Sequence, residues 1–121
     1  MILGLRTALY PAPDLQAAKR WYSDALGIPP YFDEPFYVGF TVGGFELGLV
    51  PDLTPGTAGP QPLWGVAEIG VEYERLLALG ASALEPVTAV GGGIRVAAVR
   101  DPFGNRFGLI ENPHFDVRGV R

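Results

Sequence analysis

The sequence contains no cysteine and a single histidine, His114. Without cysteine the chain has no disulfide, no thiolate nucleophile and no cysteine-ligated metal site, which fits a reducing compartment. The histidine stands near the C-terminus without an evident partner. We therefore interpret it as a tail or dimer contact and not as a catalytic base.

Long apolar runs and basic clusters are also missing. The first residues, MILGLRTALYPAPD, lack the charged start and apolar stretch of a signal peptide, and no segment is long enough to cross a bilayer. The nine Lys and Arg residues are scattered and the formal net charge is −4, which argues against nucleic acid as a partner. We expect a cytoplasmic protein that binds neither membrane nor nucleic acid.

The residues that are present predict two similar halves. In the first, Asp14 precedes a helix-like segment over 15–26, and Gly27 ends it. In the second, Glu68 takes the place of Asp14 before a helix over 69–79, and Gly80 ends it. The two spacings differ by a single residue, which indicates an internal duplication.

Strand-like segments surround each predicted helix. In the first half they cover 2–10, 28–33, 36–42 and 45–50, and in the second half 63–67, 81–87, 94–99 and 106–111. Gly43-Gly44 predicts a two-residue hairpin turn, and Asp101-Pro102-Phe103-Gly104-Asn105 predicts a second reversal. The pattern predicts the α+β class, with two tandem βαβββ modules forming a curved mixed sheet. A single domain over 1–121 would comprise module one (1–50), a Pro- and Gly-rich linker (51–62), module two (63–111) and a tail (112–121).

These motifs resemble the vicinal oxygen chelate superfamily, which includes glyoxalase I, extradiol dioxygenases and bleomycin-resistance proteins. The resemblance rests on the DPFGN turn followed by Phe107-Gly108-Leu109-Ile110, on Asp14 before Trp21-Tyr22 and Leu26-Gly27, and on 64–68 and 76–81 in the second half. It implies that each module forms a half-barrel, that the concave faces enclose an internal pocket, and that the protein is a homodimer.

The resemblance also implies four positions for metal ligands. Counting from the helix starts and from the DPFGN turn places them at Thr7, Gln61, Gly108 and either Glu46 or Gly48. Threonine and glutamine are poor ligands for a divalent metal, and glycine offers no side-chain donor. We therefore predict that the chain binds no metal and needs no cofactor.

The same positions predict where a ligand binds. Glu46 is the best candidate for a catalytic carboxylate, and the alternative is a solvent-facing acid on a hairpin strand. Gly108 leaves room for a flat ring. The predicted ligand contacts are Thr7, Phe40, Glu46, Gln61, Trp64, Arg95, Phe107 and Gly108.

Two functions remain open at this point. The first is a metal-free protein that sequesters a small, partly aromatic or apolar molecule, as bleomycin-resistance proteins do. The second is an enzyme of the glyoxalase, dioxygenase or lyase type that uses a metal or an acid–base pair such as Glu46 with Gln61 or Thr7. The missing ligands favour the first, although the fold alone does not fix the function.

Overall fold

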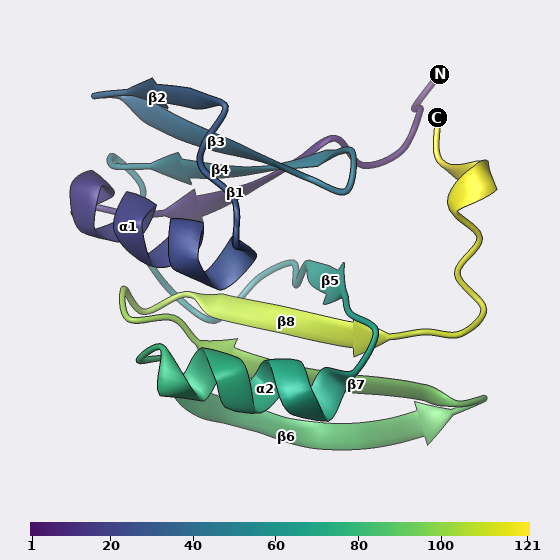
Figure 1. Cartoon of the computed structure of the whole chain (residues 1–121). Helices are drawn as coiled ribbons and strands as arrows, with labels where there is room; N and C mark the ends of the chain where they lie inside the picture. The colour runs from purple at the N-terminus through teal and green to yellow at the C-terminus, as the bar shows by residue number, and fades with distance from the viewer.

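The computed structural model describes all residues, 1–121, and contains two copies of one arrangement (Figure 1). The first copy comprises β1 (Thr7–Pro11), α1 (Leu15–Leu26), β2 (Phe32–Glu34), β3 (Tyr37–Val42) and β4 (Phe45–Val50). The second comprises β5 (Leu63–Gly65), α2 (Ile69–Ala78), β6 (Ser82–Gly91), β7 (Ile94–Arg100) and β8 (Arg106–Glu111). A short 3₁₀ helix, Val117–Gly119, follows in the tail.

The strand order is the same in the two sheets. It is β1-β4-β3-β2 in the first and β5-β8-β7-β6 in the second. In each sheet the first strand of the module pairs in parallel with the last, and the other pairs are antiparallel. The sheets are mixed and do not close into a barrel, so the predicted α+β fold with two βαβββ modules is confirmed.

The two helices begin in different ways. At α1 the Asp14 side chain accepts a hydrogen bond from the Ala17 amide at 3.1 Å, and Gly27 ends the helix with φ = 71°, as predicted. At α2 the Glu68 side chain makes no capping bond. The carboxylate of Glu111, on β8, accepts from the Ile69 amide at 2.9 Å instead. The second cap therefore comes from a residue far along the chain, which local spacing does not indicate.

The hairpins follow the prediction more closely than the outer strands do. Val42 pairs with Phe45 across Gly43 and Gly44, whose φ angles of 57° and 91° are those that a two-residue turn needs. In contrast, residues 2–5 precede β1 without joining the sheet, and Arg6 contributes only its carbonyl, which accepts from the Glu46 amide at 2.8 Å. Strand β6 runs beyond its predicted end to Gly91. The predicted strand over 2–10 was therefore too long at its start.

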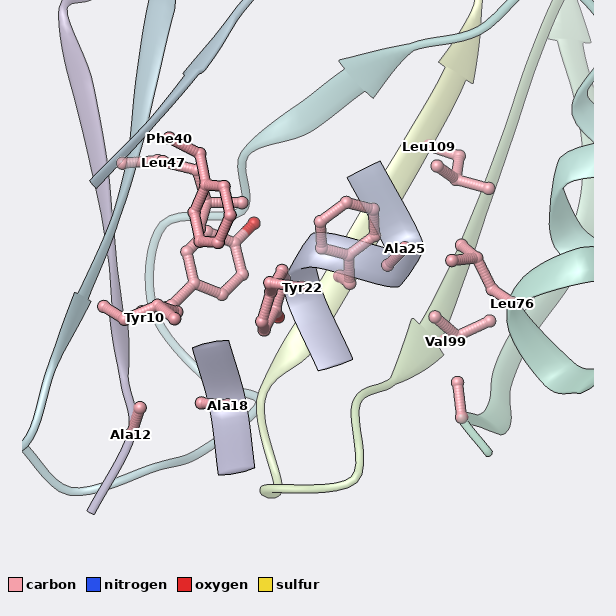
Figure 2. Close-up of a cluster of buried hydrophobic side chains, with 14 of the residues drawn as sticks. Tyr10, Ala12, Ala18, Tyr22, Ala25, Phe40, Leu47, Leu76, Val99 and Leu109 are labelled. Atoms are coloured by element: carbon pink, nitrogen blue, oxygen red, sulfur yellow. The ribbon is translucent and has the colours of Figure 1, made fainter. Parts of the chain in front are cut away.

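A single hydrophobic core of 19 buried residues lies between the two sheets. Figure 2 shows Phe40 and Leu47 of the first sheet on one side, Leu109 and Val99 of the second on the other, and Tyr22 of α1 between them. The Tyr22 ring lies 6.0 Å from that of Phe107 and 5.8 Å from that of Tyr10. The modules thus share one core and are not separate folding units.

The DPFGN turn fastens this core. Asp101 is only 2% exposed, and its carboxylate accepts hydrogen bonds from the Tyr22 hydroxyl (2.6 Å) and from the backbone amides of Phe103 (2.9 Å) and Asn105 (2.8 Å). The Asn105 side chain also donates to the Pro11 carbonyl. The turn therefore connects module two to both α1 and β1 of module one.

Neither helix of the chain is long and apolar enough to cross a membrane.

Candidate ligand-binding face

The outer surface of the first sheet carries a carboxylate surrounded by hydroxyl groups. Side chains alternate across a strand, and Leu47 and Leu49 of β4 point into the core, so Glu46 points away from it. Thr7 on β1 pairs directly with Glu46, and β3 lies on the other side of β4. We call this surface, formed by Thr7, Tyr37, Gly39, Glu46 and Gly48, the Glu46 face.

Three hydroxyl groups donate hydrogen bonds to Glu46. The Thr7 hydroxyl lies 2.9 Å and the Tyr37 hydroxyl 2.7 Å from Oε1. The Tyr31 hydroxyl donates to Oε2 from the segment before β2. The carboxylate is therefore held from three sides by groups on β1, on β3 and before β2.

A pair of glycines makes room for this arrangement. Gly39 of β3 and Gly48 of β4 are directly opposite each other in the sheet. A Cβ at Gly39 would lie 2.7 Å from Glu46 Oε2, and a Cβ at Gly48 would overlap the Tyr37 hydroxyl. Only glycine at these two positions allows Tyr37 and Glu46 to lie flat on the sheet.

The hydrogen bonds determine the charge of the cluster. Partial burial by itself raises the pKa of Glu46, but the bonds from Tyr31, Tyr37 and Thr7 together outweigh burial and hold that pKa below its ordinary value. Burial, followed by the bond to Glu46, raises the pKa of Tyr37, and the bond to Glu46 raises the pKa of Tyr31. At neutral pH the cluster is thus one carboxylate anion with neutral hydroxyl donors.

Aromatic rings extend the face beyond the carboxylate. Tyr31 is 62% exposed, Phe32 38% and Phe36 66%. The Phe32 ring lies 6.4 Å from that of Tyr31 and 6.0 Å from those of Phe36 and Tyr37. This is an exposed group of aromatic side chains beside an anion, a combination that a purely structural surface does not need.

The structure places the predicted aromatic ligand contacts in or against the core. Phe40 is fully buried and Phe107 is 4% exposed. Trp64 stacks on Phe107 with ring centres 6.3 Å apart, and its indole N–H donates to the Tyr10 hydroxyl at 2.8 Å. All three side chains lie on the inner sides of their sheets, away from the Glu46 face, because they alternate with the residues that face outward.

The polar residues from the second half also lie apart from Glu46. Arg95 binds Glu111 on the neighbouring strand at 2.9 Å, where Glu111 also caps α2. That capping bond, followed by Arg95, lowers the pKa of Glu111. Gln61 is exposed in the linker before β5. Strand pairing places Leu63, two residues later, opposite Gly108, just as Leu9 lies opposite Gly48 in the first sheet, so Leu63 corresponds to Leu9. Gln61 lies as far before Glu68 as Thr7 lies before Asp14, but it is outside β5.

The prediction that Gly108 opens a space for a ring is wrong. A Cβ at this position would lie 2.7 Å from both the Leu63 side chain and the Pro62 carbonyl oxygen. The volume is already filled by β5, which approaches β8 closely because residue 108 has no side chain. Gly108 is a packing residue of the second sheet.

The two sheet faces do not enclose one pocket within the chain. Leu47 of β4 and Leu109 of β8 point into the same core, so their neighbours Glu46 and Gly108 point away from it on different faces. We call the side of the second sheet away from the core the Gly108 face; there the exposed Leu63 covers Gly108, and Ala98 is fully buried. The expectation that Thr7, Glu46, Gln61 and Gly108 surround a common centre in one chain was therefore wrong.

Surface depressions occur elsewhere. One, of about 600 Å³, lies at the end of α1 and is lined by Ser23, Asp24, Gly27, Ile28, Pro29 and Leu79. A second lies beside it around Lys19 and Asp33. Both depressions are open to solvent, and neither contains a residue of the Glu46 face. The hydrogen-bonded cluster around Glu46 is therefore the better candidate for a binding site.

Comparison with known proteins agrees with this architecture. Residues 4–109 match the family described as the Glyoxalase/Bleomycin resistance protein/Dioxygenase superfamily. The chain belongs to this superfamily. None of the curated proteins matches the sequence significantly.

Several solved structures of the superfamily share the fold. A glyoxalase-related enzyme from Fulvimarina pelagi superposes with a TM-score of 0.77 at 22% identity, covering 96% of this chain and 93% of that one. A lactoylglutathione lyase from Agrobacterium tumefaciens gives 0.74 at 22% identity, covering 96% and 100%. A bleomycin resistance determinant encoded on transposon Tn5 gives 0.71 at 20% identity, covering 91% and 98%. At these identities the similarity shows the fold alone.

The residues present do not fit the metal site of the metal-dependent superfamily members. In the first half strand pairing places Glu46 opposite Thr7 and Gly48 opposite Leu9. The pair in the second half that matches Leu9 and Gly48 is Leu63 and Gly108, neither of which offers a side-chain donor. No group of three His, Cys, Asp or Glu side chains that could hold a metal ion occurs in the chain.

Sequence reasoning missed the two tyrosines that hold Glu46. Neither Tyr31 nor Tyr37 is among the predicted ligand contacts. The Gly43-Gly44 turn could have indicated Tyr37, because a two-residue turn fixes the strand register and pairs residue 41 with residue 46. Tyr37 then falls on the same side of the sheet as Glu46.

Proposed function

We propose that the chain is a metal-free protein that binds a small, partly aromatic or apolar molecule on the Glu46 face. The observation that supports this most directly is an ionised carboxylate, held by Thr7, Tyr31 and Tyr37, beside exposed aromatic rings. A few fixed polar groups among apolar surfaces are the general form of a small-molecule site. The glycine pair beneath the cluster adds to this support, because it leaves the space that the Tyr37 and Glu46 side chains occupy against the sheet.

Acid–base catalysis is a less suitable role for this cluster. A general base works best when its pKa lies near the operating pH. The pKa of Glu46 is lowered, and the pKa values of Tyr31 and Tyr37 are raised, so all three move away from neutrality. Neither Gln61 nor a second carboxylate hydrogen-bonds to Glu46. These properties favour an anion that binds over a group that transfers protons.

We further propose that the protein is a homodimer in which a second copy completes the site. The Glu46 face and the Gly108 face point away from each other in one chain, so only another copy can bring them together. The edges of open sheets also need cover, and C₂ dimers are the commonest assembly. The exposed Leu3, Leu5 and Phe115 add apolar surface outside the core for such a contact. Analytical ultracentrifugation at micromolar concentration should give a dimer, and a monomer would contradict this proposal.

The binding function is tested by a thermal-shift screen over metabolites and antibiotics, followed by calorimetry on the hits. We expect hits to lose affinity in Glu46→Gln and to keep it in Glu74→Gln, which makes the same charge change on an exposed residue of α2. Equal affinity for both variants would show that the site is elsewhere. Stoichiometric metal in protein purified without chelators would favour a metalloenzyme instead.

A further inference from the structure

The hydroxyl protons around Glu46 all point toward its carboxylate. The side chains of Thr7, Tyr31 and Tyr37 are neutral donors, each with one proton, and each gives that proton to the carboxylate. An ionised carboxylate has no proton to offer. What the cluster presents to a ligand is therefore a set of oxygen lone pairs and no donor.

The two carboxylate oxygens differ in their remaining capacity. Oε1 accepts from both Thr7 and Tyr37, which uses the two lone pairs of that oxygen. Oε2 accepts from Tyr31 alone. One acceptor position therefore remains on Oε2, the oxygen that lies over Gly39.

The negative charge of Glu46 has no basic partner. The chain contains five ion pairs, which involve Lys19, Arg75, Arg95, Arg106 and Arg118, and none includes Glu46. Partial burial makes an unpaired carboxylate costly, and here only neutral hydroxyls offset that cost. A cation placed at Oε2 would supply the missing charge partner.

The surrounding rings suit the same kind of ligand. Phe32, Phe36 and Tyr31 expose ring surface beside the carboxylate, and aromatic faces attract cations through their quadrupole. They also offer apolar area for the rest of a molecule. No basic side chain is hydrogen-bonded into the cluster to repel a cation or to bind an anion.

We propose that the Glu46 face recognises a protonated amine carried on an apolar or aromatic body. The ammonium group donates to Glu46 Oε2 and to the phenolic oxygens of Tyr31 and Tyr37, and the body lies against Phe32 and Phe36. This inference rests on the proposed binding function and specifies its ligand class.

Three probes with the same ring and different heads provide the test: 2-phenylethylammonium, 2-phenylethanol and 3-phenylpropionate. Each is titrated into ¹⁵N-labelled protein at neutral pH while the amide signals of Thr7, Gly39 and Gly48 are followed. We expect saturable shifts at these amides with the ammonium probe, weaker binding of the alcohol, and none with the carboxylate. Glu46→Gln keeps the shape of the side chain and should weaken ammonium binding about tenfold or more, because a charged hydrogen bond is lost.

Two further variants separate the charge from the rings. Phe32→Leu should weaken the binding of both the ammonium probe and the alcohol, whereas Glu74→Gln should change the affinity for neither. Thermal melts of every variant exclude unfolding as the cause of a loss. The inference is overturned if no probe binds, if the carboxylate binds as well as the ammonium, or if Glu46→Gln binds the ammonium as well as the wild type does. The proposed function survives those results if the library screen yields neutral or anionic ligands that depend on this face, and fails only if the screen yields none.

Discussion

Replacing Tyr22 by phenylalanine removes one buried oxygen from the contact between the modules. The Tyr22 hydroxyl donates to Asp101 Oδ2 at 2.6 Å, and both residues are buried. Without this bond, Oδ2 keeps only a long contact of 3.3 Å to the Asn105 side-chain amide. A hydrogen bond to a charged group contributes about 1.5–3 kcal/mol, so we expect the free energy of unfolding to fall by about 2 kcal/mol. For a chain of this size that corresponds to a Tm lower by roughly 8 °C.

The assay is urea unfolding followed by tryptophan fluorescence, with a thermal scan of the same samples. The control is Tyr73→Phe, which deletes the same atom from a tyrosine whose ring is mostly buried but whose hydroxyl reaches solvent and has no hydrogen bond to the protein. The control should change the unfolding free energy by less than about 0.5 kcal/mol. Equal effects of the two substitutions would refute the argument, because the loss would then come from the oxygen and not from its bond to Asp101.

Three further predictions concern the sheets. Gly108→Leu should lower the unfolding free energy, measured by urea titration, by at least about 1–3 kcal/mol, because even a Cβ at this position meets Leu63 and the Pro62 carbonyl. If the variant is as stable as wild type, β5 can move away from β8. Gly48→Ala should displace the Tyr37 ring and break its hydrogen bond to Glu46, so the pKa of Glu46 should rise. This pKa is measured by ¹³C NMR of the Glu46 carboxyl, and an unchanged pKa would argue against the contact between residue 48 and Tyr37. The pKa of Glu46 is lower in the folded chain than its ordinary value of 4.5, so the hydrogen bonds to Glu46 stabilise the fold above pH 4.5 and lose this effect as the pH falls through the lowered pKa. The unfolding free energy of wild type minus that of Glu46→Gln should therefore decline over this pH window. A difference that stays constant with pH would contradict the prediction.

The parts of the fold that follow from local chemistry were predictable. Helix α1 begins and ends where Asp14 and Gly27 indicated, because a capping side chain and a left-handed glycine act within one turn. The cap of α2 was not predictable, because Glu111 reaches it from β8. Residues 2–5 have the apolar composition of a strand but make no backbone hydrogen bond to another strand, so propensity alone extended β1 too far.

The candidate site was predictable only where strand register could be counted. Thr7 and Glu46 were identified from spacing, and the structure pairs them. Phe40 was assigned to the ligand because it is aromatic, although it pairs with the buried Leu47 and therefore points inward. The error at Gly108 has a different origin. A glycine indicates either open space or close approach of the backbone, and only the position of β5 decides between them.

The contact between the modules also determines what the linker does. The Tyr22–Asp101 bond, the Trp64–Tyr10 bond and the bond from the Trp21 indole to the Leu79 carbonyl join the halves without using residues 51–62. The chain is in effect two subunits of an internal dimer with a tether. Removing residues 55 and 56 costs the effective concentration that the tether provides and the bond from the Gly56 amide to the Asn105 side chain. The protein is thus a natural candidate for division into two fragments, 1–54 and 57–121, that find each other through their own buried surface.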